Sequence, residues 1–398
     1  MVLDKQQQPD VKQAIKVLVA ASLFQLFLGV IYIWGIFVLP VSQAFEWDIS
    51  TVQLTSSFKI GFFVLGNFTG GKLQTRLPAH HVSMLGGLLL SGGVLAAALL
   101  PPTYPWLFYL SYGIVGGLGA GMGYIVAITA AQRWFPTKRG LATGICVGAF
   151  GLSVTLLAPV LTWLLGFRTV QETFMIMSAT FFLASLLFGR LVTFPESTSG
   201  ATTASVFVGE QYTTTQILAK KEFYCLLCSL LLVTVGFFVI NPSVQTLSMA
   251  RGFDVSFATV LLMITGISNT LGRIIVPTLA DKFKNETIMM ILFGILGFAA
   301  LMLTFAEGVL FVVMVALIPI CFGAGLATIP LLVSNYFGMQ NFGANYSAVG
   351  VGFATSALFM PGLLGMLGDY STRFIAVSIL SLLGILAMLP LRMSANKG

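Results

Sequence analysis

The chain has 398 residues, of which 57% are hydrophobic and only 8% are charged, and its formal net charge is +7. Soluble globular proteins carry about 25% charged residues, so this composition excludes a soluble enzyme, a nucleic-acid-binding protein and a disordered scaffold. The sequence predicts a membrane protein that crosses the bilayer several times.

Apolar runs of about 20 residues, long enough to cross the hydrocarbon layer as helices, follow one another along the sequence. They lack the alternating ten-residue pattern of an outer-membrane β-barrel. The polar stretch Met1–Lys16 leads into a first span that is too long for the apolar core of a signal peptide, so no cleavable signal is expected. The predicted fold class is an all-α membrane protein. Its twelve transmembrane helices are predicted at residues 14–40, 51–75, 82–101, 105–132, 140–166, 172–194, 222–250, 256–281, 287–305, 309–335, 342–368 and 372–391.

Lysine and arginine residues gather on one side of these spans. With the N-terminus in the cytoplasm, fifteen fall on the inner side and three on the outer side, while Lys59 and Arg273 lie within spans. This excess follows the positive-inside rule. Both termini are therefore expected in the cytoplasm, the protein is expected in the inner or plasma membrane, and the basic charge indicates topology instead of a nucleic-acid partner.

The longest polar break, Pro195–Lys221, follows the sixth span and divides the chain into halves that resemble each other. The loop after span two, Gly70–Pro78, aligns with the loop after span eight, Val276–Asn285, so that Arg76 matches Lys282. Parallel halves with a site between them at mid-membrane are a recurring transporter plan. We predict an N-terminal six-helix bundle at 1–195, a cytoplasmic loop at 196–220 and a C-terminal six-helix bundle at 221–398.

Nothing in the sequence is typical of an enzyme. There is no metal-ligand cluster, no nucleophile–base constellation and no phosphate-binding loop at a strand–helix junction. Cys225 and Cys228 form a C-x-x-C pair, but no histidine or further cysteine lies near enough in the sequence to complete a metal site. We expect no catalytic residues, no metal and no cofactor.

Arg273 lies inside span eight, within the stretch Ile267–Thr278. A cation on a spanning helix costs at least about 3 kcal/mol on insertion scales and is expected to face the bundle interior. Neighbouring helical positions carry no acidic residue, and Asn269, one turn earlier, is neutral. The planar guanidinium suits a carboxylate, so Arg273 is a candidate substrate ligand. The alternative is an ion pair with Asp254 or another acid near the outer end, or contacts with carbonyl groups.

Lys59, in span two, is the second cation within a span. The alignment of the two halves matches Arg273 with Asn67 and Lys59 with Thr265. Lys59 is therefore predicted about two turns closer to the outside than Arg273. Its long stem either reaches outward to water or lines an outer vestibule, where its charge attracts anions.

Several other polar or amphipathic residues lie within apolar spans. Asn241 precedes Pro242, where a broken backbone hydrogen bond exposes polar groups to a cavity. The candidates of this kind for substrate contact are Tyr32, Trp34, Tyr124, Asn241 and Gln245.

Two halves of six spans, with a G-x-x-x-D-R/K-type loop after spans two and eight, resemble the major facilitator superfamily. The first loop carries Thr75 where the family usually has aspartate, whereas the second keeps Asp281 and Lys282. The stretch Arg133–Ser153 (RWFPTKRGLATGICVGAFGLS) resembles the signature that enters span five in monocarboxylate transporters and the oxalate:formate antiporter group. Gly29–Val41 (GVIYIWGIFVLPV) resembles the aromatic segment of that group, and the arginine of span eight falls where the group has its substrate-binding arginine.

This resemblance implies that Arg273 binds the substrate carboxylate. It also implies that Tyr32, Trp34 and Tyr124 form part of an aromatic cage around a small anion.

Two departures from the group bear on the substrate and on coupling. Phe353 stands where the oxalate transporter has a lysine in span eleven, so one mid-depth charge suits a monoanion unless Lys59 supplies a second. Asn269 stands where animal-type monocarboxylate transporters have an aspartate implicated in proton coupling, which puts coupling through that pair in doubt.

The leading hypothesis is a secondary transporter of small monocarboxylates such as lactate, pyruvate or formate. It would be a monomer in the lipid bilayer that takes up a carboxylate anion with protons by alternating access. An anion exchanger of oxalate:formate type, and a transport-dead membrane sensor or scaffold, are the alternatives. Expected substrate contacts are Arg273, Tyr124, Tyr32, Trp34, Asn269, Phe353 and Asn241; coupling or vestibule candidates are Lys59 and Asp254; the predicted conformational-switch loops contain Asp281, Lys282 and Arg76.

Overall fold

The computed structural model describes residues 11–100, 104–195 and 210–395, and within these ranges all regular elements are helices. The first ten residues, the end of predicted span three at residue 101 and part of the predicted central loop lie outside the described residues.

Six helical rods make up the described N-terminal half, residues 11–195. Two of them contain tighter or wider turns: a 3₁₀ segment follows the first helix, and a π-helical turn opens the fourth rod. In order the elements are α1 (Val11–Leu28), η1 (Gly29–Phe37) and α2 (Val38–Phe45); α3 (Ile49–Leu73); α4 (Ala79–Leu99); α5 (Pro105–Phe108), η2 (Tyr109–Val115) and α6 (Gly116–Trp134); α7 (Arg139–Leu165); and α8 (Val170–Leu187) with η3 (Gly189–Leu191).

The described C-terminal half, residues 210–395, begins with the short helix α9 and continues with six rods. The rod after α9 breaks at Asn241, because Pro242 has no N–H to donate to the preceding turn. This confirms the predicted break. The elements are α9 (Thr214–Ile217); α10 (Lys221–Ile240), η5 (Asn241–Ser243) and α11 (Val244–Ala250); α12 (Val255–Leu279); α13 (Asn285–Met302); α14 (Gly308–Phe337); α15 (Phe342–Val349) and α16 (Val351–Gly365); and α17 (Tyr370–Ala395).

Eleven of the rods in the described part of the chain are long and apolar enough to cross a membrane. The exception is α3, which carries Lys59 within its 25 residues. At 1.5 Å per residue it is about 38 Å long, which is also sufficient to span the hydrocarbon layer. Each rod corresponds to one predicted span, so the twelve-span all-α prediction is confirmed.

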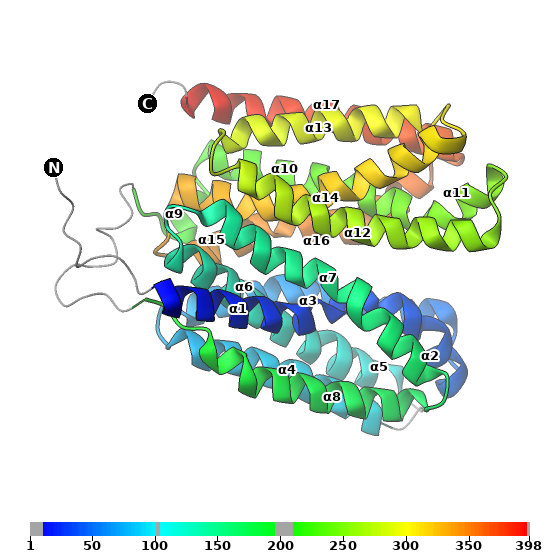
Figure 1. Ribbon diagram of the computed structural model, residues 1–398, viewed down its shortest axis with the longest axis horizontal. Coiled ribbons are helices and arrows are strands. Elements are labelled where there is room, and N and C mark those ends of the chain that lie inside the picture. Colours follow the sequence, from blue (N-terminus) through cyan, green and yellow to red (C-terminus); the bar gives the residue numbers. More distant parts are fainter. Residues whose placement is uncertain (1–10, 101–103, 196–209, 396–398) are drawn as a thin grey trace.

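The two halves lie side by side, and both described chain ends lie at the same end of the molecule (Figure 1). We call this the termini end and the opposite end, where α2 and α11 lie, the far end. Within the N-terminal half α6 packs against α3 and α4, and within the C-terminal half α12 packs against α14 and α10 against α16. The halves meet mainly through α7 against α12 and α3 against α15.

Close backbone contacts join the halves at the termini end. A Cβ atom on Gly71 of α3 would collide with the backbone of Gly343 in α15, and one on Gly140 of α7 would collide with the Pro277 carbonyl oxygen in α12. Only glycine permits approach this close. The two halves are therefore in direct contact at this end.

Candidate substrate site

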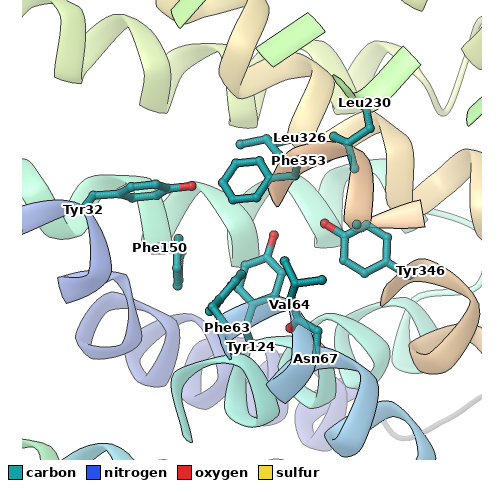
Figure 2. Close-up of a pocket in the computed structure, with 11 residues that line it drawn as sticks. Tyr32, Phe63, Val64, Asn67, Tyr124, Phe150, Leu230, Leu326, Tyr346 and Phe353 are labelled. Carbon is teal, nitrogen blue, oxygen red and sulfur yellow. The ribbon is translucent and has the colours of Figure 1, made fainter. Parts of the chain in front are cut away.

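A cavity lies between the two halves (Figure 2). It contains about 360 Å³ of space free of protein atoms, part of which is open to the outside. The residues that line it are Tyr32, Phe63, Val64, Asn67, Tyr124 and Phe150 from the N-terminal half, and Leu230, Leu326, Tyr346, Gly350 and Phe353 from the C-terminal half.

Aromatic rings form the wall on the N-terminal side. Phe150 of α7 packs edge-to-face against Tyr32 of η1, with ring centroids 5.4 Å apart, and against Tyr124 of α6, at 4.8 Å. Phe63 of α3 adds a further edge contact with Tyr124 at 5.2 Å. Such pairs hold one another in fixed geometry, so the wall is pre-formed.

Two tyrosines face each other across the cavity. The hydroxyl of Tyr124, from the N-terminal half, interacts with the hydroxyl of Tyr346, from α15 of the C-terminal half. Both side chains are buried and line the cavity (Figure 2). The pair supplies neutral donor and acceptor groups within an otherwise mainly apolar lining.

Arg273 of α12 lies next to this wall and is completely buried. Its Nε donates to the Asn269 side-chain oxygen at 3.0 Å, one terminal nitrogen donates to the Val147 carbonyl at 3.3 Å, and the other donates to the Tyr32 hydroxyl at 3.4 Å. Val147 and Tyr32 belong to the N-terminal half, whereas Arg273 and Asn269 belong to the C-terminal half. The guanidinium therefore links the two halves directly.

All three of these acceptors are neutral. Among the described residues no carboxylate lies within salt-bridge distance of Arg273. The predicted alternative of an ion pair with Asp254 is wrong, because Asp254 lies 19 residues earlier, about 28 Å along α12. The predicted alternative of carbonyl contacts is confirmed for one nitrogen, which Val147 accepts. Within the described residues, the positive charge of Arg273 has no protein counter-charge in this state.

Phe353 of α16 lines the cavity, but Trp34 does not. Trp34 is buried inside the N-terminal half, with its ring 4.8 Å from that of Tyr112 and 5.9 Å from that of Phe108. The reason is helical geometry: Trp34 follows Tyr32 by two positions in η1, where each residue turns by about 120°. One of the two side chains must therefore point away from the cavity.

Lys59 neither reaches water nor lines this cavity, which differs from both expected placements. It is 1% exposed, and its Nζ lies 3.7 Å from the centroid of the Tyr112 ring. The side chain points into the N-terminal half because small residues of α6 bring the two helices together; a Cβ on Gly117 would lie 2.7 Å from the Lys59 carbonyl oxygen.

Asp254 and Asn241 also lie apart from the cavity. Asp254 begins α12 at the far end and accepts hydrogen bonds from the Ser256 hydroxyl at 2.6 Å and the Phe257 N–H at 2.9 Å. These two bonds lower the pKa of the Asp254 carboxyl. Asn241 is half-buried at the break between α10 and α11 and is absent from the cavity lining.

The loop after α12 bridges the halves at the termini end. The Asp281 carboxylate accepts the Gly140 N–H at 2.7 Å and the Leu141 N–H at 3.0 Å, so it caps the first turn of α7 from the other half of the molecule. Lys282 and Arg76 are exposed at the same end. Of the three predicted switch residues, only Asp281 makes the bridging contact.

No pattern in the sequence singled out Tyr346, Phe150, Gly350 or the other apolar lining residues as site residues. Tyr346 precedes Phe353 by seven positions, which corresponds to about two turns of a helix and places both residues on one face of the predicted span. Because Phe353 was a predicted substrate contact, this spacing could have predicted that Tyr346 also lines the cavity. Asn67 was the position matched to Arg273 by the alignment of the halves, and it lines the cavity.

Two helical halves that enclose a cavity, with a buried cation at their contact, define a polytopic membrane transporter. The Major Facilitator Superfamily model matches residues 19–350 of the chain. The protein belongs to this superfamily.

Relatives of known sequence support the same family. The chain is 27% identical to an uncharacterized MFS-type transporter, YhjX, of Escherichia coli over 86% of this chain and 85% of the relative. It is 25% identical to the oxalate:formate antiporter of Oxalobacter formigenes over 91% and 87%, and 28% identical to monocarboxylate transporter 13 of Rattus norvegicus over 66% and 60%.

Solved structures share the fold at low sequence identity. The proton:xylose symporter XylE is similar with a TM-score of 0.73 and 15% identity over 95% of each chain. FucP in the outward conformation gives a TM-score of 0.71 at 17% identity, over 94% of this chain and 98% of that one. These likenesses concern the fold.

Proposed function

We propose that the protein is a proton-coupled symporter of small monocarboxylates of the lactate, pyruvate or formate type, working by alternating access. The observation that carries this proposal is Arg273, a buried cation between the halves whose partners are all neutral. A carboxylate is the natural counter-charge for a planar guanidinium, because two parallel N–H donors match its two oxygens.

Binding would replace two of the existing hydrogen bonds. The bonds to Val147 and Tyr32, at 3.3 and 3.4 Å, are the longer ones, while the 3.0 Å bond to Asn269 orients the guanidinium. A substrate carboxylate takes the place of these two neutral acceptors on the terminal nitrogens. The aromatic wall at Phe150 and Tyr124 then packs against the short carbon chain of the substrate.

The lining supports a monoanion over a dianion. Phe353 brings an apolar ring to the cavity, and Lys59 is not among the residues that line it. A second carboxylate would therefore lose its hydration without gaining a counter-charge. The names of two relatives, the oxalate:formate antiporter and monocarboxylate transporter 13, support small carboxylates as the substrate class.

Alternating access has a physical basis in the contacts between the halves. In this state the termini end is closed by the Asp281 cap on α7 and by the contact of Gly71 with Gly343. Opening this end requires these contacts to break and the halves to rock about the region of Arg273. With both termini in the cytoplasm, the orientation that the lysine and arginine distribution favours, the closed end is the inner gate.

Substituting Arg273 tests the proposal. Each hydrogen bond to a charged group is worth about 1.5–3 kcal/mol, so Arg273→Gln should weaken carboxylate binding by about a hundredfold or more. The measurement is uptake of labelled L-lactate into proteoliposomes, driven by an imposed inward proton gradient. Gradient-driven uptake in the natural protein supports symport, whereas acceleration only by internal formate or oxalate would make the protein an exchanger.

Controls separate loss of binding from loss of folding. Arg168→Gln removes an exposed arginine whose partner is the neighbouring Glu172, and it should leave uptake unchanged. The Arg273 variant should insert and elute as a single species like the natural protein. Unchanged uptake by Arg273→Gln would refute the assignment of the carboxylate site.

A further inference from the structure

The described part of the N-terminal half contains a buried lysine amine that no carboxylate pairs with. Lys59 is 1% exposed, and its Nζ makes no hydrogen bond. Its close contact is the face of the Tyr112 ring, 3.7 Å from the nitrogen. A ring face attracts a cation, but it does not replace the acceptors that an ammonium group has in water.

The surrounding helices bring no negative charge to Lys59. In sequence the nearest carboxylates are Glu46 and Asp48, both exposed, and Asp48 lies eleven residues earlier, about 16 Å along α3. The elements packed against α3 are α2, α4, α6, α15, α16, η1 and η2. Their described titratable side chains are Tyr112 at the nitrogen, Tyr109 near the far end, Tyr32, Tyr124 and Tyr346 at the cavity, and His80, His81 and Arg133 toward the termini end.

The other unsatisfied polar atoms near Lys59 in the fold are neutral. Trp34 Nε1, the Tyr112 hydroxyl and Thr55 Oγ1 are buried without hydrogen-bond partners. Trp34 contacts the Tyr112 ring, and Thr55 lies one turn before Lys59 on α3. None of them can neutralise a charge. A protonated Lys59 is therefore costly here, and the neutral amine costs less to bury than the charged form.

Lys59 lies close to the cavity along its own helix. Lys59, Phe63 and Asn67 are spaced four residues apart and so share one face of α3. Phe63 and Asn67 both line the cavity. The backbone of Lys59 is therefore about 6 Å along the helix axis from the nearest of these two lining residues. An anion in the cavity is the negative charge that can approach this face.

We propose that Lys59 carries the transported proton. Its amine is neutral when the cavity is empty and gains one proton when a monocarboxylate occupies the cavity; the anion's charge then balances the new ammonium, so the loaded carrier has the same net charge as the empty one. Because coupling between two sites is reciprocal, protonation of Lys59 strengthens carboxylate binding by the same factor. This inference rests on the proposed function and assigns its proton-carrying group.

The first test compares two modes of transport in proteoliposomes with labelled L-lactate. One-to-one symport allows a gradient of one pH unit to sustain about tenfold accumulation, since each corresponds to about 1.4 kcal/mol. Lys59→Met, which keeps the length of the side chain and removes the amine, should lose this accumulation. It should still exchange internal for external lactate, because exchange needs no net movement of protons. Lys72→Met, an exposed lysine on the same helix, should retain both.

The second test measures protons directly. Purified protein in weakly buffered detergent solution, mixed with saturating L-lactate, should take up about one proton per bound carboxylate, and Lys59→Met should take up none while still binding lactate. Gradient-driven accumulation by Lys59→Met, or proton uptake by this variant on binding lactate, would overturn the assignment of Lys59, whereas gradient-independent exchange as the sole activity of the natural protein would overturn the proposed symport. Failure of the natural protein to bind or transport any monocarboxylate would overturn the proposed function itself.

Discussion

Arg273 shows how a membrane-buried charge can be hydrogen-bonded and still unbalanced. Each of its three nitrogens donates one hydrogen bond, to a side-chain amide, a carbonyl and a phenol. Dipoles lower the cost of burial, but they leave the unit charge in place. The residue thus remains attractive to an anion that enters the cavity beside Tyr32.

Asn269 accepts a hydrogen bond from Arg273, and its substitution gives a prediction at the residue scale. Asn269→Asp would put a carboxylate at the position from which the amide oxygen now accepts Arg273 Nε at 3.0 Å. An internal ion pair competes with the substrate, and a hydrogen bond to a charged group is worth about 1.5–3 kcal/mol. We expect lactate affinity to fall by about tenfold to a hundredfold.

Isothermal titration of lactate over pH 5 to pH 8 would check this. The loss of affinity should persist across this range, because a carboxylate paired with a guanidinium stays ionised well below pH 5. An affinity equal to that of the natural protein across this range would show that Asn269 does not act through the charge of Arg273.

The sequence predicted the placement of some of these buried residues but not of all. The cost of a charge in a spanning helix predicts that Arg273 faces the interior, and it does. Trp34 was expected beside Tyr32, although two residues separated by two positions in a helix point to different sides. Lys59 was expected either to extend to water or to line an outer vestibule, but the glycines of α6 pack closely against α3 and the side chain is buried in the N-terminal half. This placement depends on tertiary packing that the sequence of one span does not reveal.

At the scale of elements, helix ends perform two different tasks. The far end of α12 is capped by its own Asp254, which only fixes the start of the helix. The termini end of α7 is capped by Asp281 from the other half, so that the cap is also a contact between the halves. Breaking this cap removes two charge-assisted hydrogen bonds from the closed state alone.

Asp254 gives a prediction on pH dependence. Its hydrogen bonds lower the pKa of the carboxyl, so the cap stabilises α12 above the unfolded pKa and loses this contribution only as pH falls through the still lower folded pKa. The group is therefore ionised throughout the pH 5 to 8 range. Asp254→Asn should leave the pH profile of lactate uptake in this range unchanged, as measured in proteoliposomes. A shifted profile would make Asp254 part of the coupling machinery.

Helix breaks were predictable only where a proline marks them. Pro242 predicted the change at Asn241, because a missing N–H is a local property. The 3₁₀ segment Gly29–Phe37, the π-helical turn Tyr109–Val115 and the break at Gly350 were predicted as uninterrupted spans. Their sequences contain no such marker, and these breaks accompany packing against neighbouring helices.

At the scale of the whole molecule, the closed termini end depends on residues without side chains. Gly71→Val would place atoms where the backbone of Gly343 lies, and neither backbone can yield as a flexible side chain does. We expect this variant to lose the closed arrangement and most transport. Gly92→Val is the matched control, because a Cβ at Gly92 meets nothing within 4 Å.

The separation of the halves can be measured by pulsed electron paramagnetic resonance. The two spin labels are attached at Arg76→Cys and Lys282→Cys, which are exposed positions at the termini end. The exposed Cys228 is first replaced by serine. The distance distribution should shift to longer values in Gly71→Val and stay unchanged in Gly92→Val. An unshifted distribution would mean that the contact does not hold the halves together.

The number of spans and the all-α class were predictable from apolar length alone, since the bilayer fixes the length of a helix. How the halves meet was not. The approach of Gly71 to Gly343, and of Gly140 to Pro277, joins positions more than a hundred residues apart. A single sequence does not show which of its distant glycines will come into contact in the folded protein.

The limited hydropathy of α3 has a consequence for how the chain is made. Helix α3 carries Lys59 at its middle and has few strongly apolar turns. On its own, such a helix partitions poorly from the translocon into the lipid bilayer. Its polar face is covered by α6, which is synthesised some sixty residues later. We therefore expect α3 to remain beside the insertion machinery until α6 emerges, so that residues 49–134 enter the bilayer as one cooperative unit.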